Sequence, residues 1–178
     1  MVDLDSAAVE KIKRVKLLIL DVDGVLTDGS INYTDDGREI KSFNVKDGHG
    51  IKLLMRSGVG VALVTARESE AVAIRAKDLG VEDLFQGQKE KVGAFEAILE
   101  KRGVSAEETA YVGDDLIDLP VLRITGFSVA VSNAVAEVRE AVDYVTKLDG
   151  GRGAVREITD LICRVQGTWD EVTGRYFK

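Results

Sequence analysis

The sequence contains one cysteine, one proline and no long apolar run, and each shortage restricts what the protein can be. Cys163, within the apolar stretch "LICRV", has no partner in the chain, so an intrachain disulfide is excluded and a reducing compartment is allowed. We interpret Cys163 as a packing residue, because free cysteine is usually buried and inert. No apolar stretch approaches the length of a bilayer span, and residues 1–15 carry too many charges for the centre of a signal peptide. We therefore expect a cytoplasmic protein with no membrane partner.

Positive charge is also scarce. The chain has 24 Lys and Arg against 31 Asp and Glu, which gives a formal net charge of −7. Nucleic-acid phosphates require clustered cations, so we expect no nucleic-acid partner, whereas a small anionic substrate needs only a local cluster. A content of 45% hydrophobic and 31% charged residues is typical of globular proteins. The length of 178 residues predicts a single domain, residues 1–178.

Short apolar runs rich in Val, Ile and Leu alternate with segments of helical periodicity. This alternation predicts an α/β fold, a doubly wound and mainly parallel sheet with helices on both faces. The helical segments lie at about 50–58, 68–80, 91–103, 115–125, 133–141 and 153–166. The expected strands lie at about 16–21, 60–65, 83–85, 109–113, 127–131 and 143–146.

One segment interrupts the alternation. "SINYTDDGREIKSFNV", residues 30–45, is typical of two strands joined by a turn at "DDG", which predicts a β-hairpin inserted after the first strand. An isolated hairpin is marginal in water, so we expect a neighbouring subunit to pack against it. The tail, residues 167–178, holds the only Trp and two further aromatic residues, and we expect it to dock rather than fray.

Acidic, hydroxyl and basic residues follow several predicted strands at the points where the strands end. Open α/β sheets bind their ligands at this edge, so we expect these residues to form one site. The motif "GDDLID" is also typical of a helix N-cap with an acidic first turn, which leaves a structural role open for part of it. The candidate residues come from "DVDG", "VTAR", "QKEKVG" and "VGDDLID": Asp21, Asp23, Thr65, Lys91, Asp114, Asp115 and Asp118.

Converging carboxylates repel one another unless a cation lies between them, and hard oxygen ligands suit Mg²⁺. A phosphate dianion can then approach an Asp nucleophile, which is a known covalent acceptor of phosphoryl groups. Thr65 offers a hydroxyl, and Lys91 offers a charge that offsets the phosphoryl oxygens. Asp21 and Asp23 point to the same side of an extended backbone, so one can attack while the other transfers protons. We expect neighbouring carboxylates to keep the proton on Asp23 near neutral pH.

These motifs carry a resemblance to a known family. "LDVDGVLTDG", "TAR", the lysine at 91 and "GDDLID" together resemble the haloacid dehalogenase superfamily of aspartyl phosphatases, in the order which that family uses. More narrowly, "DGHGIKLL", "QGQ", "YVGDDLIDLPV" and "GGRGAVRE" are similar to its phosphatases that act on 3-deoxy-D-manno-octulosonate 8-phosphate in lipopolysaccharide precursor synthesis. The resemblance covers residues 15–167 and implies the superfamily's Rossmann-like fold without a separate cap domain.

The resemblance assigns roles by position. It implies that Asp21 is the nucleophile and a Mg²⁺ ligand, and that Asp23 is the general acid and base and binds Mg²⁺ through its backbone carbonyl. Asp114 is then the third protein ligand, while Asp115 and Asp118 support the metal shell and the Lys91 amine. The sugar acid and its phosphate are expected to contact Asp23, Asn44, Val45, Lys46, Asp47, Gly48, Lys52, Arg67, Arg75 and Lys91. The family is a tetramer whose hairpins meet at the central axis, so the resemblance also implies a homotetramer in which neighbouring subunits and the tail close each site.

Two motifs receive a structural interpretation. His49, the only histidine, lies between two glycines, and we expect it in a loop or at a helix N-cap, since Asp23 already fills the proton-transfer position. "GGRGAV" lacks the third glycine of a dinucleotide loop, so we reject NAD binding, although Arg152 could contact a phosphate or carboxylate.

Other functions remain open at this point. The same chemistry would suit a nine-carbon sugar-acid 9-phosphate, and related domains also occur as noncatalytic tetramerisation modules. A signalling receiver gathers similar residues, but its phosphorylated Asp lies on a middle strand of the sequence. Dehalogenation does not use the carboxylate of Asp23, and a phosphomutase would need a cap for which the chain is too short.

Overall fold

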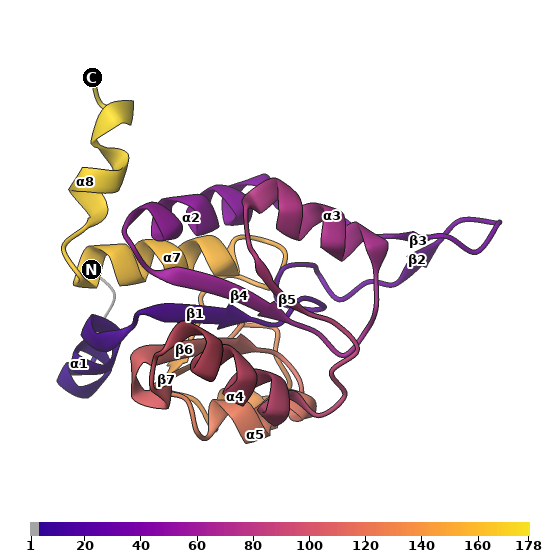
Figure 1. The fold of residues 1–178 in the computed structure, drawn as a ribbon, viewed down its shortest axis with the longest axis horizontal. Coiled ribbons are helices and arrows are strands. Elements are labelled where there is room, and N and C mark those ends of the chain that lie inside the picture. The colour runs from indigo at the N-terminus through magenta and orange to yellow at the C-terminus, as the bar shows by residue number, and fades with distance from the viewer. Residues whose placement is uncertain (1–3) are drawn as a thin grey trace.

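The computed structural model describes residues 4–178 and centres on a six-stranded parallel sheet of order β5-β4-β1-β6-β7-β8 (Figure 1). Each strand that the apolar runs predict is present, within one or two residues at either end. β1 occupies the middle and pairs in parallel with β4 on one side and β6 on the other. The strands are β1 Leu17–Leu20, β4 Gly60–Val64, β5 Asp83–Phe85, β6 Thr109–Gly113, β7 Phe127–Ala130 and β8 Tyr144–Val145.

Helices cover both faces of the sheet, which confirms the doubly wound α/β fold (Figure 1). α2, α3 and α7 lie on one face, and α4 and α5 lie on the other. None of the helices in residues 4–178 has the length and apolar character that crossing a bilayer requires. The α-helices are α1 Ser6–Arg14, α2 Val45–Arg56, α3 Glu70–Leu79, α4 Lys91–Arg102, α5 Leu119–Leu122, α6 Ala136–Arg139, α7 Ala154–Val165 and α8 Trp169–Thr173, and the 3₁₀ turns are η1 Ala106–Glu108, η2 Leu116–Asp118 and η3 Gly174–Tyr176.

The central strands are buried on both faces. All four residues of β1 are at most 1% exposed, and every residue of β6 and β7 is also buried. Such strands are continuous apolar runs because both side-chain directions meet helices. The rigid centre of the sheet therefore fixes the positions of the loops that leave its carboxyl edge.

The inserted hairpin is shorter than the sequence predicts. Its strands, β2 Asn32–Tyr33 and β3 Glu39–Ile40, have two residues each, and the turn between them uses Gly37 at a φ of +83°. In Figure 1 the hairpin projects away from the sheet. Ile31, Tyr33 and Ile40 are 54%, 61% and 50% exposed, so its apolar side chains find little to pack against in this chain.

The start of α2 corrects two expectations. Asn44 caps the helix by accepting a hydrogen bond from Lys46 N at 2.8 Å, so residues 45–49 are helical and the hairpin does not extend to 45. His49 therefore lies inside α2, and the expected loop or N-cap position is wrong. The glycine at 50 lowers helix propensity, but α7 packs there so closely that a Cβ on Gly50 would overlap Thr159. Close packing outweighs local propensity at this point.

The tail docks on the body through α8 and the turn that follows. Val172 is buried, and the Arg164 guanidinium lies 3.8 Å from the centre of the Trp169 ring. Tyr176 lies against α2, where its hydroxyl is 2.9 Å from Nε2 of His49 and the two rings meet edge to face. The tail therefore contacts α2 of its own chain.

Candidate active site

Three polar residues directly follow three neighbouring strands at the centre of the sheet. Asp21 follows β1, Thr65 follows β4 and Asp114 follows β6. Because β1 lies between β4 and β6 and all three run in parallel, the residues meet at one edge. A pocket of about 250 Å³ opens there, and Asp23 and Arg67 also line it. The predicted convergence of the strand-end motifs is therefore present.

Lys91 is the cation of this edge. It is the first residue of α4, and its side chain is fully buried. Its Nζ lies 2.7 Å from Oδ1 of Asp21 and 2.7 Å from Oδ1 of Asp118. A buried ammonium is stable only when it is paired, and two carboxylates supply that pairing. Lys91 thus fixes the position of the Asp21 carboxylate.

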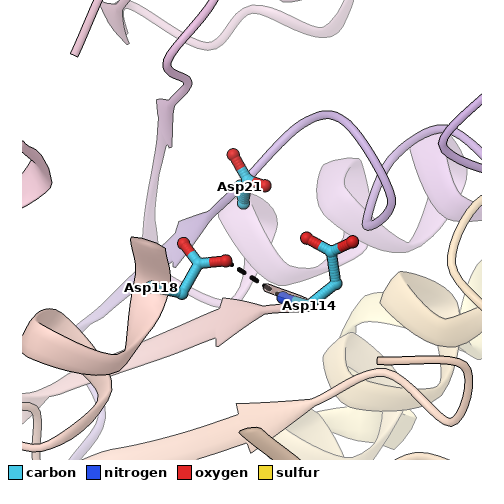
Figure 2. Close-up of side chains that lie close together, drawn as sticks. All are labelled: Asp21, Asp114 and Asp118. Carbon is cyan, nitrogen blue, oxygen red and sulfur yellow. Dashed lines mark hydrogen bonds between the residues drawn. The ribbon is translucent and has the colours of Figure 1, made fainter. Parts of the chain in front are cut away.

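Asp118 uses both of its oxygens within the protein. Oδ1 accepts hydrogen bonds from Lys91 Nζ and from the Tyr111 hydroxyl, each at 2.7 Å. Oδ2 accepts from the backbone N–H groups of Asp114 at 3.0 Å and Asp115 at 3.3 Å, and Figure 2 shows the first of these bonds. With four donors around it, Asp118 orients Lys91 and the loop after β6.

A metal ion could be held between Asp21 and Asp114. One carboxylate oxygen from each of Asp21, Asp114 and Asp118 lies within 4.8 Å of the others, so the first two are close enough to share one ion (Figure 2). Since four donors surround the Asp118 carboxylate, it fits the supporting position that the family resemblance implies. The carbonyl of Asp23 as a further ligand stays a prediction.

The titration of the two acids reflects the same crowding. Burial raises the pKa of Asp21 to about 8, although the Lys91 ammonium opposes the shift. Burial and then the charges of Asp118 and Asp115 raise the pKa of Asp114 to about 6. Burial lowers the pKa of Lys91, but Asp21 and Asp118 outweigh it, so the net shift is upward. Neighbouring carboxylates with raised pKa values resist ionisation because their charges repel. A divalent cation bound between them stabilises their ionised forms.

Glycines allow the loops of the site to touch. Gly24 has a φ of +91°, and a Cβ there would overlap the Asp114 carboxylate. A Cβ on Gly150 or Gly151 would overlap the backbone of the loop after β1, at Gly24 and Thr27. The "GGRG" motif therefore packs against the nucleophile loop, and Arg152 pairs with Asp28 at 3.2 Å, a carboxylate of the protein itself.

Asp23 has a different environment from the one that we expected. Its Oδ1 forms an ion pair with Lys41, and its Oδ2 lies 3.9 Å from Nε of Arg67. Both cations also bind Glu39, Lys41 at 3.3 Å and Arg67 at 2.9 Å. Cations from the hairpin and from the loop after β4, rather than the other carboxylates of the site, therefore face Asp23. Sequence reasoning missed Lys41 and Glu39, because only the folding of the hairpin against the site brings them there.

The predicted substrate segment at the start of α2 contacts the start of α7 and the glycine-rich loop before it. Asp47 is 1% exposed, and it accepts hydrogen bonds from the backbone N–H groups of Gly153 at 3.3 Å and Arg156 at 2.7 Å, so it caps α7. Asn44 donates to Gly151 O at 3.4 Å. Asp47 is thus fully engaged within the protein.

The remaining predicted contacts spread around α2 and α3. Asn44, Val45 and Lys46 line a second pocket of about 490 Å³. Arg75 donates to Asn44 O at 3.3 Å and covers Gly48 so closely that a Cβ would overlap its guanidinium. Lys52 is half-buried further along α2. Of the predicted substrate residues, Asp23 and Arg67 line the first pocket, and Lys91 contacts its Asp21. Three line the second pocket, and the other four line neither: Asp47, Gly48, Lys52 and Arg75.

Comparison with known proteins identifies the family. The family model for haloacid dehalogenase-like hydrolases matches residues 80–158. The chain is 48% identical to the 3-deoxy-D-manno-octulosonate 8-phosphate phosphatase KdsC of Escherichia coli K12, over 97% of this chain and 92% of that protein. The chain belongs to the 3-deoxy-D-manno-octulosonate 8-phosphate phosphatase family. The resemblance that the motifs carry is therefore confirmed.

Solved structures of this phosphatase family share the fold. The enzyme from Moraxella catarrhalis, solved with magnesium, phosphate and a KDO molecule, has a TM-score of 0.93 and 41% identity, over 95% of this chain and 97% of that chain. The cobalt-bound form from Haemophilus influenzae has a TM-score of 0.89 and 43% identity, over 94% and 99%. Both proteins bind a divalent metal, which agrees with the acidic cluster of Asp21 and Asp114 in this member of the phosphatase family.

Proposed function

We propose that the protein is a Mg²⁺-dependent phosphoric monoester hydrolase that converts 3-deoxy-D-manno-octulosonate 8-phosphate to 3-deoxy-D-manno-octulosonate and phosphate, a step of lipopolysaccharide precursor synthesis. The observation that carries the proposal is the arrangement of Asp21, which pairs with Lys91 at 2.7 Å and has a carboxylate oxygen within 4.8 Å of one from Asp114. The family's activity on this substrate and its metal-bound structures support the same assignment.

The residues divide the reaction into two steps. An oxygen of Asp21 attacks phosphorus while the bond to the sugar oxygen breaks, and Asp23 gives its proton to that leaving oxygen. A water molecule then attacks the aspartyl-phosphate and passes a proton to Asp23, and phosphate leaves as Asp21 is restored. Thr65 donates its hydroxyl to a phosphoryl oxygen, and Lys91 offsets the charge on the transferred group. Bound Mg²⁺ would reduce the repulsion between Asp21 and the phosphate dianion.

Assembly completes the proposal. The exposed apolar side chains of Ile31, Tyr33 and Ile40 support a homotetramer in which hairpins pack together, since a hairpin of this size is marginal alone. We propose a single domain over residues 1–178 and a cytoplasmic location, with subunit contacts rather than a cap closing each site.

A phosphate-release assay tests this function. Wild type should hydrolyse 3-deoxy-D-manno-octulosonate 8-phosphate in the presence of Mg²⁺, and a chelator should stop the reaction. Asp21→Asn should remove turnover while circular dichroism shows an intact fold. Activity that survives in Asp21→Asn would refute the nucleophile. Faster hydrolysis of a nine-carbon sugar-acid 9-phosphate would reassign the substrate, and failure on every sugar phosphate would favour a noncatalytic module.

A further inference from the structure

Four charged side chains join the hairpin to the candidate active site, and we call them the hairpin junction: Asp23, Glu39, Lys41 and Arg67. Lys41 lies just after β3, pairs with Asp23 and lies 3.3 Å from Glu39. Arg67 donates to Glu39 at 2.9 Å and lies 3.9 Å from Asp23. The junction thus contains two carboxylates and two cations, and the balance of charge keeps them together.

The burial of Lys41 is its unusual feature. Its side chain is 1% exposed, although the hairpin to which it belongs is largely exposed. Lysine is almost never fully buried, because removing an ammonium from water is costly unless carboxylates compensate for the lost hydration. By contrast, the ion pair between Arg38 and Asp36 in the turn of the hairpin is exposed and local. Lys41 therefore differs from the other charged residues at the end of the hairpin, because its side chain is buried against the candidate active site.

The two oxygens of Asp23 have different surroundings. Oδ1 accepts a hydrogen bond from Lys41 Nζ. Oδ2 is buried and has no hydrogen-bond partner among the described residues, and the same holds for Nε of Arg67. Buried polar atoms normally form hydrogen bonds, so the absence of one at Oδ2 of Asp23, a residue that lines the pocket, indicates that a ligand atom binds there. Lys41 therefore holds one oxygen of Asp23, while the other faces Nε of Arg67 at 3.9 Å, beyond hydrogen-bond distance.

We propose that Lys41 is a positioning residue, which holds Oδ1 of Asp23 so that Oδ2 is the oxygen that exchanges the proton with the substrate. The inference rests on the proposed phosphatase function and extends it to the inserted hairpin. In the first step the proton on Asp23 moves to the leaving sugar oxygen as the bond from phosphorus to that oxygen breaks. Lys41 touches neither the phosphate nor the sugar, and it acts only through the orientation of Asp23.

This role predicts a dependence on the leaving group. A sugar alcohol is a poor leaving group and needs the proton of Asp23, whereas the nitrophenolate of 4-nitrophenyl phosphate departs without one. The ratio kcat/KM reports the steps up to formation of the aspartyl-phosphate, which include departure of the leaving group. A misplaced Asp23 should therefore reduce kcat/KM for the sugar phosphate and spare the aryl phosphate.

The experiment compares both substrates on Lys41→Met, which keeps the length of the side chain but removes its charge. The expected result is a loss of about tenfold to 100-fold in kcat/KM for the sugar phosphate, and less than about threefold for the aryl phosphate. Because both values come from one preparation, their ratio does not depend on how much of the variant is folded. Lys41→Arg should restore part of the ratio, because it keeps the positive charge. An unchanged ratio in Lys41→Met would overturn the positioning role.

Two controls separate the possible failures. Lys101→Met removes an ion pair to the buried Asp83, at 2.5 Å and outside the site, and should leave the ratio unchanged. Asp23→Ala should change the ratio at least as much as Lys41→Met. An equal loss on both substrates in Asp23→Ala would overturn the assignment of the general acid, and with it the role of Lys41. Absence of hydrolysis by wild type on either substrate would refute the phosphatase function itself.

Discussion

Gly24 lies so close to the Asp114 carboxylate that the candidate metal site has no room for a side chain at residue 24. The glycine has a φ of +91°, and a Cβ at this position would overlap Oδ2 of the Asp114 carboxylate. The loop after β1, which carries Asp21 and Asp23, therefore approaches the loop after β6 only because residue 24 is glycine. The two halves of the candidate metal site are brought together by this contact.

Gly24→Ala should accordingly damage metal binding more than stability. The methyl group has to displace the Asp114 carboxylate, so we expect Mg²⁺ affinity to fall by about tenfold or more, in line with disturbed ligand shells. Gly58→Ala is the matched control, because Gly58 has a φ of +94° but no atom within 4 Å of the added methyl. Both variants should lose ~1–2 kcal/mol of unfolding free energy from backbone strain. Equal Mg²⁺ affinity in the two variants, measured by titration calorimetry, would contradict the contact.

The pH dependence of Mg²⁺ binding follows from the raised pKa values of two acids. Without metal, the pKa of Asp21 is raised to about 8 by burial, and the pKa of Asp114 is raised to about 6 by burial and neighbouring acids. Metal binding must displace these protons, so affinity should increase as the pH rises from about 5 to 8, by about tenfold per pH unit for each displaced proton. Calorimetry in buffers of different ionisation enthalpy should detect the release of protons. An affinity that is constant over this range would refute the prediction.

The stability of the metal-free protein should change in the opposite direction. The folded pKa of Asp21 lies above its ordinary value of 3.8, so the native state binds more protons than the unfolded state between these two values. Its contribution to stability is present below pH 4 and is lost as the pH rises through about 8. Added Mg²⁺ should oppose this loss at pH 8, because it binds the ionised carboxylates. Thermal unfolding at pH 6 and pH 8, with and without Mg²⁺, measures the difference.

The sequence predicted the sheet because buried parallel strands leave a local signal. The run "LLIL" of β1 and its counterparts are continuous and apolar, and their ends mark the positions of Asp21, Thr65 and Asp114. The first turn of α2 left a weaker signal, because polar residues and two glycines follow Val45, and the close packing of these glycines against Arg75 and α7 is seen only in the folded chain. A local sequence pattern predicts strands that are buried on both faces of the sheet. It fails where contacts with a neighbouring element determine the backbone conformation.

The same distinction applies to the candidate site. The nucleophile, the metal pair and Lys91 follow strand ends or open a helix, so their positions depend on the sheet alone. Lys41 and Glu39 reach Asp23 only because the hairpin folds back on the loop after β1, and Asp47 caps α7 because α2 and α7 pack together. These contacts join segments that are distant in the sequence, and no short motif predicts that the segments lie together. Tertiary structure was needed to find them.

Tyr111→Phe tests whether the network beneath the site serves the reaction. The Tyr111 side chain is fully buried on β6, and its hydroxyl donates to Oδ1 of Asp118 at 2.7 Å, the same oxygen that holds Lys91. The phenylalanine keeps the packing but removes one of the four donors of Asp118, so the protein should lose ~1–3 kcal/mol of unfolding free energy. Lys91 should then hold the Asp21 carboxylate less firmly, and kcat should fall by about tenfold with little change in KM.

The matched control for this variant is Tyr144→Phe. The Tyr144 hydroxyl donates to Oε1 of Glu157 at 2.7 Å, away from the residues of the site. The Tyr144→Phe variant therefore loses the same kind of bond between a phenol and a carboxylate. Its kcat should remain at the wild-type level while its stability decreases. If the two variants lose stability and retain equal kcat values, the hydroxyl of Tyr111 serves folding alone, and Asp118 holds Lys91 and Asp21 in place without it.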